Sequence, residues 1–451
     1  MQASDVCPLP KVSTHFIGDS VISRAIYSQL ELVAESFSFP TSLTFDESGT
    51  PYIAEAGLPF GGAPPGGRVW KIEQDGRRTL LAQNLRQPVN GLTYYRGSLY
   101  LSEGGHPGAS GRISRLDLDG RQTVILDNLP GPGNYHTNMV AFGPDGKLYF
   151  SQGAMTNTGY VGLDAYELGW LRLLPHAHDL PGYEIELAGV NLETANPLNK
   201  EGGARTRTGA FVPFGKSTEP GQRVPARLPC TSAVMRCNSD GSDLELVAWG
   251  LRNAYGLGFL PDGRLLAVDQ GADDRGSRPV GNVPDLLFEV RRGAWYGWPD
   301  FIGVDPITDP HYLPVRGPKP VFALANHHEL PPPEKELLRF PPHAAAVKFD
   351  VAPPSLPRWR GQIFVALFGD EVPMTAPSGP HAGRSVACID PTDWSLHTII
   401  ESPFARPIDV RFHPISNALY LLDFGNFEMH AERGVVAENN TGKLWRLTLE
   451  E

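Results

Sequence analysis

The chain has 451 residues, of which 41% are hydrophobic and 10% aromatic, so it can bury a large core and is not expected to be disordered. Its 39 basic and 50 acidic residues give a net charge of -11 at pH 7, which offers no basic surface to nucleic acid or to an anionic membrane. No apolar run reaches the roughly 20 residues of a membrane helix. We therefore expect a soluble protein with no nucleic acid partner and no membrane span.

Glycine and proline are unusually frequent. With 49 and 43 residues they form about a fifth of the chain, whereas roughly 12% is usual. Residues of this kind end strands and helices and form tight turns. Their spread along the whole chain favours many short strands.

The four cysteines are too few for a disulfide framework. Cys230 and Cys237 are seven residues apart in a segment that we predict to be extended, which places them about 23 Å apart on opposite faces. They are not expected to bridge each other. Free thiols are the main interpretation, and a pair between Cys7 and a later cysteine is the alternative.

Six segments repeat one pattern, an apolar–aromatic pair followed by a turn and a β-rich run. They begin at Leu43, Leu92, Val140, Leu257, Val347 and Val410. A second hairpin lies behind them, as in GRISRLDLDGRQTVILDNL. Four strands per repeat are typical of propeller blades. We predict an all-β fold in which residues 1–451 form a single six-bladed β-propeller domain.

The N-terminal region supplies the strand that the last repeat lacks. The last repeat ends at GKLWRLTLEE after three strands, whereas residues 29–36 (QLELVAES) resemble the fourth strand of other repeats, notably DLELVAWG. We predict that 29–36 pairs with 443–449, which closes the sixth blade and covers an open edge; a stray edge strand is the alternative. Residues 1–28 are an extension, and they contain no basic segment followed by an apolar one, so no export signal is expected in the chain as given.

The long connections all fall on one face of the predicted propeller, whereas tight turns such as PDGK and LDGR fall on the other. The two longest insertions, 154–229 and 300–341, would lie over the channel mouth, and PPPEKELLRF in the second predicts a helical turn. Long loops on a rigid scaffold commonly build binding sites. We therefore expect a pocket at this mouth.

Several motifs in this frame resemble the soluble glucose/sorbosone dehydrogenase family. They are YHTNMVAFGPDGKLYF, WGLRNAYGLGFLPDGRLLAVDQGADD, GAWYGWPDF, RWRGQIFVALFGD and RPIDVRFHPISNALYLLDFG, within residues 130–450. The resemblance implies a dehydrogenase that binds pyrroloquinoline quinone (PQQ) and Ca²⁺ and oxidises a small sugar-like substrate. It also implies an external electron acceptor and a periplasmic or secreted location.

Hydride transfer to a quinone needs a base for the substrate hydroxyl and a positive charge against the quinone oxygen. By resemblance, His136 is the base and Arg252, paired with Asn253, contacts the quinone oxygens. Arg406 in RPIDV matches an arginine that we assign to a cofactor carboxylate. Tyr255 stands where the family has a cofactor-binding glutamine, and Lys348 lies one position from its quinone-contacting lysine.

The segment DQGADD, residues 269–274, matches the calcium loop of that family. The resemblance assigns metal ligation to the carbonyls of Gly271 and Ala272, with Asp273 and Asp274 beside them. Oxygen ligands in a tight loop suit a hard cation. The sequence thus predicts Ca²⁺ at the channel mouth.

Three positions depart from the family pattern. Ala154 replaces the aspartate that orients the base, Tyr255 replaces glutamine, and Ile408 replaces a second arginine. Two other functions therefore stay open. One is a metal-dependent hydrolase of the lactonase type, and the other is a non-catalytic propeller that binds a glycan or a protein. The metal of the hydrolase would be held by side chains at the strand starts, namely Asn90, Asn138, Asn253 and Asp409.

Overall fold

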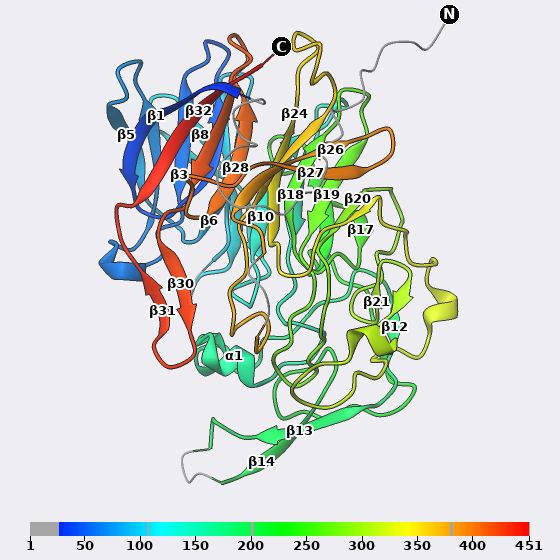
Figure 1. The fold of residues 1–451 in the computed structure, drawn as a ribbon. Coiled ribbons are helices and arrows are strands. Elements are labelled where there is room, and N and C mark those ends of the chain that lie inside the picture. Colours follow the sequence, from blue (N-terminus) through cyan, green and yellow to red (C-terminus); the bar gives the residue numbers. More distant parts are fainter. Residues whose placement is uncertain (1–26, 106–107, 200–202, 379–381, 451) are drawn as a thin grey trace, which may run out of the picture.

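The computed structural model describes residues 27–105, 108–199, 203–378 and 382–450. Six four-stranded antiparallel sheets stand around a common axis as the blades of a β-propeller, which confirms the predicted fold class (Figure 1). Cys7 and the extension up to residue 26 lie outside the described residues.

The blades follow one another along the chain. Blade 1 contains β2 (Pro40–Phe45), β3 (Pro51–Glu55), β4 (Gly67–Ile72) and β5 (Arg78–Leu85). Blade 2 contains β6 (Val89–Tyr95), β7 (Ser98–Glu103), β8 (Gly111–Asp117) and β9 (Gln122–Leu129). Blade 3 contains β10 (Thr137–Phe142), β11 (Leu148–Gln152), β16 (Ala233–Cys237) and β17 (Glu245–Trp249).

The second half of the ring repeats this order. Blade 4 contains β18 (Ala254–Phe259), β19 (Leu265–Asp269), β20 (Leu286–Glu289) and β23 (Leu338–Arg339). Blade 5 contains β24 (Ala346–Val351), β25 (Ile363–Leu367), β26 (Ser385–Asp390) and β27 (Ser395–Ile400). Blade 6 contains β28 (Pro407–Phe412), β29 (Leu419–Asp423), β32 (Gly442–Leu449) and β1 (Tyr27–Phe37).

The ring closes through its inner strands and through the N-terminal strand. Each inner strand contacts the next one, and β28 of blade 6 contacts β2 of blade 1. β1 pairs antiparallel with β32, for example Leu30 with Leu447 and Leu32 with Trp445. The predicted pairing of 29–36 with 443–449 is therefore confirmed, and it covers the edge that β32 would otherwise expose.

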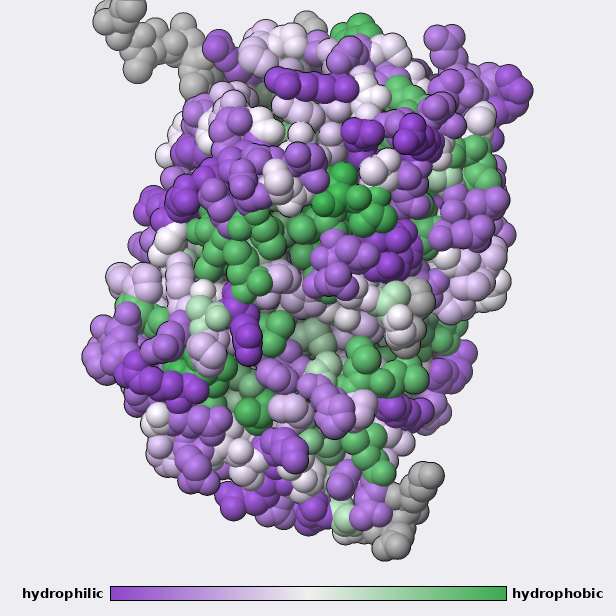
Figure 2. Space-filling model, turned by 180° about the vertical axis from the view of Figure 1, so that it is seen from behind, coloured by the Kyte–Doolittle hydropathy of each residue, from purple (hydrophilic) through white to green (hydrophobic). Residues whose placement is uncertain are grey.

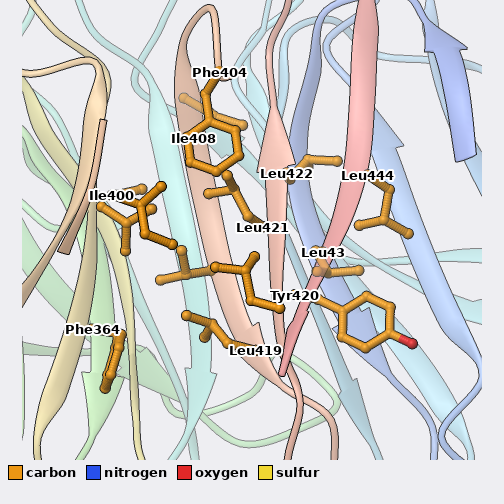
Figure 3. Packing of buried hydrophobic residues seen from close by; sticks show 14 of the residues in the cluster. Leu43, Phe364, Ile400, Phe404, Ile408, Leu419, Tyr420, Leu421, Leu422 and Leu444 are labelled. Atoms are coloured by element: carbon orange, nitrogen blue, oxygen red, sulfur yellow. The ribbon is translucent and has the colours of Figure 1, made fainter. Parts of the chain in front are cut away.

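The pattern of burial follows the position of each strand in its blade. The second strand β29, LYLLD, is buried along its whole length because blades pack on both of its faces. The outer strand β5 is largely exposed or half-buried, since one of its edges faces solvent. Leucine, isoleucine and phenylalanine side chains from β28, β29 and neighbouring blades interlock between the sheets (Figure 3).

The long connections lie at one end of the blades, as predicted (Figure 1). They contain the short helix α1 (Leu163–Glu167) and several two-stranded ribbons. The ribbons are β12 (Ile185–Glu186) with β15 (Arg223–Val224), β13 (Asn191–Ala195) with β14 (Arg205–Gly209), β21 (Phe301–Ile302) with β22 (Asp305–Pro306), and β30 (Phe427–His430) with β31 (Gly434–Ala437). There are also 3₁₀ turns at Phe60–Gly62 (η2), Trp170–Arg172, Pro310–Tyr312 and His327–Glu329.

One sequence prediction in these connections is wrong. PPPEKELLRF forms no helical turn, because Leu338 and Arg339 at its end form β23 and pair with β20 as the outer strand of blade 4. The unpaired edge of β20 provides backbone hydrogen bonds that outweigh the local helix preference of Glu334, Lys335 and Glu336.

A buried ion pair joins the two long insertions. Asp300 is fully buried and accepts hydrogen bonds from a guanidinium nitrogen of Arg278, from Nε2 of His327 at 2.9 Å and from the backbone N–H of Leu324 at 2.8 Å. Arg278 also donates to the carbonyl of Thr158 at 3.0 Å. These bonds hold segments near residues 158 and 320 together, so the loops over the mouth are fixed in position.

The three described cysteines, Cys230, Cys237 and Cys388, are buried free thiols, so the first two do not bridge. Apolar residues form patches on the outer surface among hydrophilic ones (Figure 2). Within the described ranges, no helix has both the length and the apolar character needed to cross a membrane.

The closing strand gives a stability prediction. Phe37 of β1 is fully buried, whereas Leu32 on the same strand is 41% exposed. Phe37→Ala should lower the free energy of unfolding by about 3–5 kcal/mol because it leaves a cavity between blades. Leu32→Ala, the matched control, should cost less than about 1 kcal/mol. Thermal melts followed by circular dichroism test this, and equal melting temperatures for the two variants would contradict a stabilising role of the closure.

Candidate functional site

A cavity of about 570 Å³ lies at the mouth of the central channel. Its floor takes one residue near the start of each of the six inner strands, and the long loops form its sides. The six floor residues are Thr41, Asn90, Asn138, Tyr255, Val347 and Ile408. Every blade therefore contributes to the same pocket.

Asp269, the last residue of β19, holds the backbone of the two residues that precede β18. The Asp269 carboxylate accepts the backbone N–H of Arg252 at 3.1 Å and that of Asn253 at 2.7 Å. Burial raises the pKa of Asp269 to about 7. These bonds set the backbone from which the Arg252 and Asn253 side chains reach the cavity wall.

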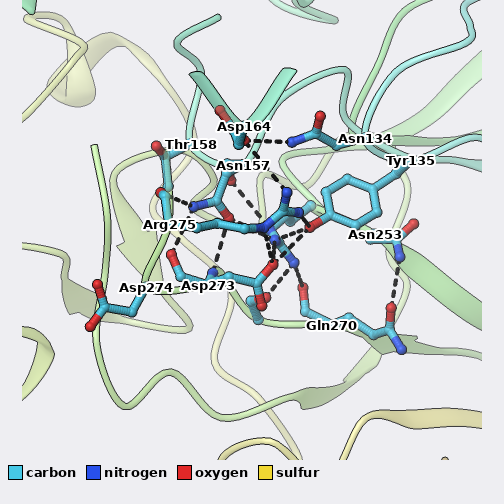
Figure 4. A network of polar contacts seen from close by, with 12 residues as sticks. Asn134, Tyr135, Asn157, Thr158, Asp164, Asn253, Gln270, Asp273, Asp274 and Arg275 are labelled. Atoms are coloured by element: carbon cyan, nitrogen blue, oxygen red, sulfur yellow. Dashed lines mark hydrogen bonds and ion pairs between the residues drawn. The ribbon is translucent and has the colours of Figure 1, made fainter. Parts of the chain in front are cut away.

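The Arg252 guanidinium lies at the centre of a polar network, of which Figure 4 labels Tyr135, Asn157 and Asp273. It donates to Oδ1 of Asn157 at 2.7 Å and to Oδ2 of Asp273 at 2.8 Å. It also donates to the Gly271 carbonyl and to the Tyr135 hydroxyl. The side chain is only 4% exposed, so its charge acts in a place with little water to screen it.

A second arginine, Arg275, shares the same carboxylate. Its Nε lies 3.0 Å from Oδ2 of Asp273, and its guanidinium lies 3.6 Å from the carboxylate of Asp164. Burial alone would raise the pKa of Asp273, but the two guanidiniums outweigh burial and hold it below 3.8. Asp273 is therefore ionised at neutral pH, and it holds two arginines on one side of the cavity.

His136 lies on the cavity wall and is half-buried. Burial lowers its pKa to about 4, although the backbone of Gly104 acts in the opposite direction. Its Nδ1 is buried and has no hydrogen-bond partner among the described residues. Ala154, which replaces the family's orienting aspartate, is fully buried, and its side chain offers no hydrogen-bond acceptor. At neutral pH the ring is neutral and able to accept a proton.

Amide side chains connect blades 3 and 4 along the floor. Asn138 donates to Oδ1 of Asn253 at 2.8 Å, and Asn253 donates to Oε1 of Gln270 at 2.8 Å. All three residues line the cavity. The chain of bonds fixes which way each amide points.

Lys348 does not line the cavity. Its ammonium donates to the carbonyls of Thr41 and Asn90, and it lies 5.0 Å from the centre of the Tyr255 ring. Burial lowers the pKa of Lys348 to about 7. The lysine thus ties β24 to β2 and β6 across the channel, immediately behind two of the floor residues.

Arg406 also lies outside the lining of this cavity. Its guanidinium donates to the carbonyls of Phe427 at 3.0 Å and Asp370 at 2.7 Å, and to the Glu428 carboxylate at 3.1 Å. It borders a separate cavity of about 310 Å³. The structure therefore brings Arg252, but not Arg406, to the predicted site.

The predicted calcium loop is only partly arranged as expected. Gly271 and Ala272 line the cavity, but the Gly271 carbonyl already accepts a hydrogen bond from Arg252. Asp274 is directed away from the cavity and accepts the N–H of Val315 at 2.7 Å. No cluster of three or more His, Cys, Asp or Glu side chains suited to a metal occurs among the described residues. Arg252 therefore places its positive charge where the sequence predicted Ca²⁺.

Only some of the side chains predicted to bind the metal of a hydrolase line the cavity. Asn90, Asn138 and Asn253 line the cavity, whereas Asp409 does not. The Asp409 carboxylate accepts the N–H of Leu43 at 2.8 Å and lies 3.3 Å from Nε of Arg411. It serves to join blades 6 and 1.

Several charged residues of the wall were not predicted from the sequence. Arg275 follows directly after the predicted calcium loop. A basic residue next to the four predicted oxygen ligands of Ca²⁺ could have indicated that an arginine binds these oxygens. Asp285 and Glu371 gave no such signal, because distant loops bring them to the cavity. Burial raises the pKa of Asp285 to about 6 and that of Glu371 to about 7.

The fold is shared with three solved structures of sugar dehydrogenases. A putative oxidoreductase (glucose dehydrogenase) from Thermus thermophilus is 18% identical with a TM-score of 0.52, and the match covers 93% of this chain and 99% of that one. The PQQ-bound aldose sugar dehydrogenase from Streptomyces coelicolor is 15% identical with a TM-score of 0.55, over 94% and 98%. The pyranose dehydrogenase PQQ domain from Coprinopsis cinerea is 13% identical with a TM-score of 0.54, over 94% and 97%.

No protein-family model matches the chain, and no curated protein matches it in sequence. At such low identities, the likeness to the three structures establishes the propeller fold.

The shared carboxylate gives a prediction with a defined pH dependence. Asp273→Asn leaves two buried guanidiniums without their common counter-charge and should cost about 3–5 kcal/mol. Because the pKa of Asp273 is lowered in the folded state, its stabilising effect is present above the unfolded value and is lost as the pH falls below 3.8. Denaturant unfolding at pH 7 and pH 3 should show a large difference from wild type that shrinks in acid. Asp262→Asn, in an exposed turn pair, is the control.

Proposed function

We propose that this protein is a PQQ-dependent oxidoreductase that oxidises an alcohol or hemiacetal group of a small sugar-like molecule. The observation that carries the proposal is the convergence of His136 and Arg252, from neighbouring blades, on one cavity at the channel mouth. A neutral imidazole and a buried guanidinium can supply the base and the positive charge that hydride removal from an alcohol requires.

One part of the cavity wall fits a planar, carboxylated quinone, whereas the acidic side chains of Glu167, Asp285 and Glu371 line other parts. Two guanidiniums, Arg252 and Arg275, lie on the fitting part beside the amides of Asn138, Asn253 and Gln270. PQQ, when bound, would supply a quinone carbonyl as the hydride acceptor. Arg252 would lie against the oxygen that gains charge, and Arg275 replaces Arg406 as our assignment for a carboxylate.

His136 acts as the base in this proposal. Its ring accepts the proton of the substrate hydroxyl while the carbon loses a hydride, so the substrate loses two electrons and two hydrogens. A general base of this kind is worth roughly 10²–10⁴ in rate. The missing partner of Nδ1 leaves the ring less firmly oriented, so we expect modest turnover.

The proposal assigns the positive charge at residues 269–274 to Arg252 rather than to Ca²⁺. A cation there would compete with Arg252 for the Gly271 carbonyl and for the Asp273 carboxylate. Reoxidation requires an external electron acceptor, and by resemblance to the family the protein is periplasmic or secreted.

Cofactor titration and dye reduction test the assignment. The protein should bind PQQ and then reduce a dye in the presence of a sugar or a related alcohol. His136→Ala should lower kcat by roughly 10²–10⁴ while PQQ affinity changes little. Arg275→Met should weaken PQQ binding instead, and Arg264→Met, in an exposed turn, should change neither.

Two results would overturn the assignment. One is a lack of PQQ uptake, and the other is full activity of His136→Ala. Release of acid from a lactone, measured with a pH indicator, would favour the hydrolase.

Two titrating groups predict how the activity depends on pH. Because the pKa of His136 is lowered to about 4, its neutral form is present above that pH, and kcat/KM should fall only as the pH drops toward 4. Glu371, whose pKa is raised to about 7, repels an anionic cofactor only when ionised. PQQ should therefore bind more tightly at pH 6 than at pH 8, and Glu371→Gln should reduce that difference, the remainder coming from Asp285 and Lys348. An acid limb near pH 6.5, or an unchanged slope in the variant, would contradict these assignments.

A further inference from the structure

One side of the cavity wall is made of aromatic rings. Phe60, Phe368, Phe424 and Phe427 all line the cavity. The ring centres of Phe60 and Phe427 are 5.5 Å apart, those of Phe424 and Phe427 are 5.7 Å apart, and those of Phe368 and Phe424 are 5.3 Å apart, each pair edge to face. This cluster, the phenylalanine wall, comes from blades 1, 5 and 6, and the acidic residues Asp370 and Glu371, which follow Phe368 in the chain, line the cavity as well.

The β30–β31 hairpin extends the phenylalanine wall outward. Met429 and Val435 are directly opposite each other in the hairpin and both line the cavity. The next residue, Val436, faces the separate cavity beside Arg406. This alternation is that of an ordinary strand pair, so one face of the hairpin adds two apolar side chains to the phenylalanine wall.

The hairpin is held in place from its other face. Glu428 forms ion pairs with Arg384 at 2.8 Å and with Arg406 at 3.1 Å. A Cβ atom at Gly61 of η2 would lie 2.4 Å from the carbonyl oxygen of Ala437, so the backbones of η2 and the hairpin are in close contact. The apolar surface is therefore formed before any ligand arrives.

The opposite side of the cavity is polar. His136, Arg252 and Arg275 lie there, together with the amides of Asn138 and Asn253. A free sugar carries hydroxyl groups around its whole ring, and hydroxyls buried against the phenylalanine wall would lose hydrogen bonds to water without replacement. A molecule with one polar and one apolar part matches the two sides.

We propose that the substrate is an alcohol or hemiacetal that carries an aryl or alkyl group, with the polar part against His136 and the apolar group against the phenylalanine wall. This inference rests on the proposed function, since that function identifies the polar side as the reacting side. It names the substrate class as hydrophobically substituted sugars or similar alcohols rather than free sugars.

The test compares D-glucose with 6-O-benzyl-D-glucose. Both sugars have a free anomeric carbon. Isothermal titration calorimetry on the PQQ-treated protein should show about ten- to hundredfold tighter binding of the benzyl compound. The double variant Met429→Gln/Val435→Thr should weaken this preference without abolishing it, because the four phenylalanines remain. Val436→Thr is the matched control, because Val435 and Val436 are 39% and 38% exposed and face opposite ways; it should keep the preference.

The outcomes separate this inference from the function on which it rests. Equal affinity for the two sugars, or a benzyl preference that the double variant leaves unchanged, would overturn the inference even if the protein reduces a dye. A benzyl preference that depends on Met429 and Val435 supports the inference even if no dye reduction is found, in which case only the proposed reaction fails.

Discussion

The site depends on one repeated interaction, a carboxylate at the end of a second strand that binds the backbone leading into the first strand of its blade. Asp269 binds the N–H groups of Arg252 and Asn253, and Asp423 does the same for Ala405 and Arg406. Glu55 and Glu103 bind single N–H groups in blades 1 and 2. These buried bonds fix the backbone of the channel mouth, and the functional side chains inherit their directions from it.

The electrostatics of the cavity follow from that fixed backbone. Arg252 is directed at the loop after β19, where carbonyl and carboxylate oxygens converge, and it binds them itself. Asp273 then attracts Arg275, so two guanidiniums gather at one wall of a protein whose net charge is -11. The positive charge that an anionic ligand requires is thus confined to one wall of the cavity. It comes from two arginines that share the Asp273 carboxylate.

The two sides of the cavity come from different blades. Blades 3 and 4 present the imidazole, guanidiniums and amides, whereas blades 5, 6 and 1 present phenylalanines and the β30–β31 hairpin, together with Asp370 and Glu371 of blade 5. Arg406 takes part only indirectly, because its bonds to Glu428 and to the Phe427 carbonyl brace the hairpin from behind. A residue that the sequence suggested for the cofactor thereby supports the apolar side instead.

The sequence by itself determined the architecture, because period-2 alternation, turn residues and the repeat itself are local signals that recur six times. It also placed His136, Arg252 and Asn253 at the channel mouth, since a position in the repeat defines a position in the blade. Only the tertiary structure decided which charges meet there. Lys348 binds carbonyls of two other blades, and Arg406 binds the β30–β31 hairpin and blade 5. Glu371, Met429 and Val435 reach the cavity through loops that do not follow the repeat. Contacts between segments hundreds of residues apart leave no periodic pattern in the sequence, so the division of the cavity into a polar and an apolar side became visible only in the folded chain.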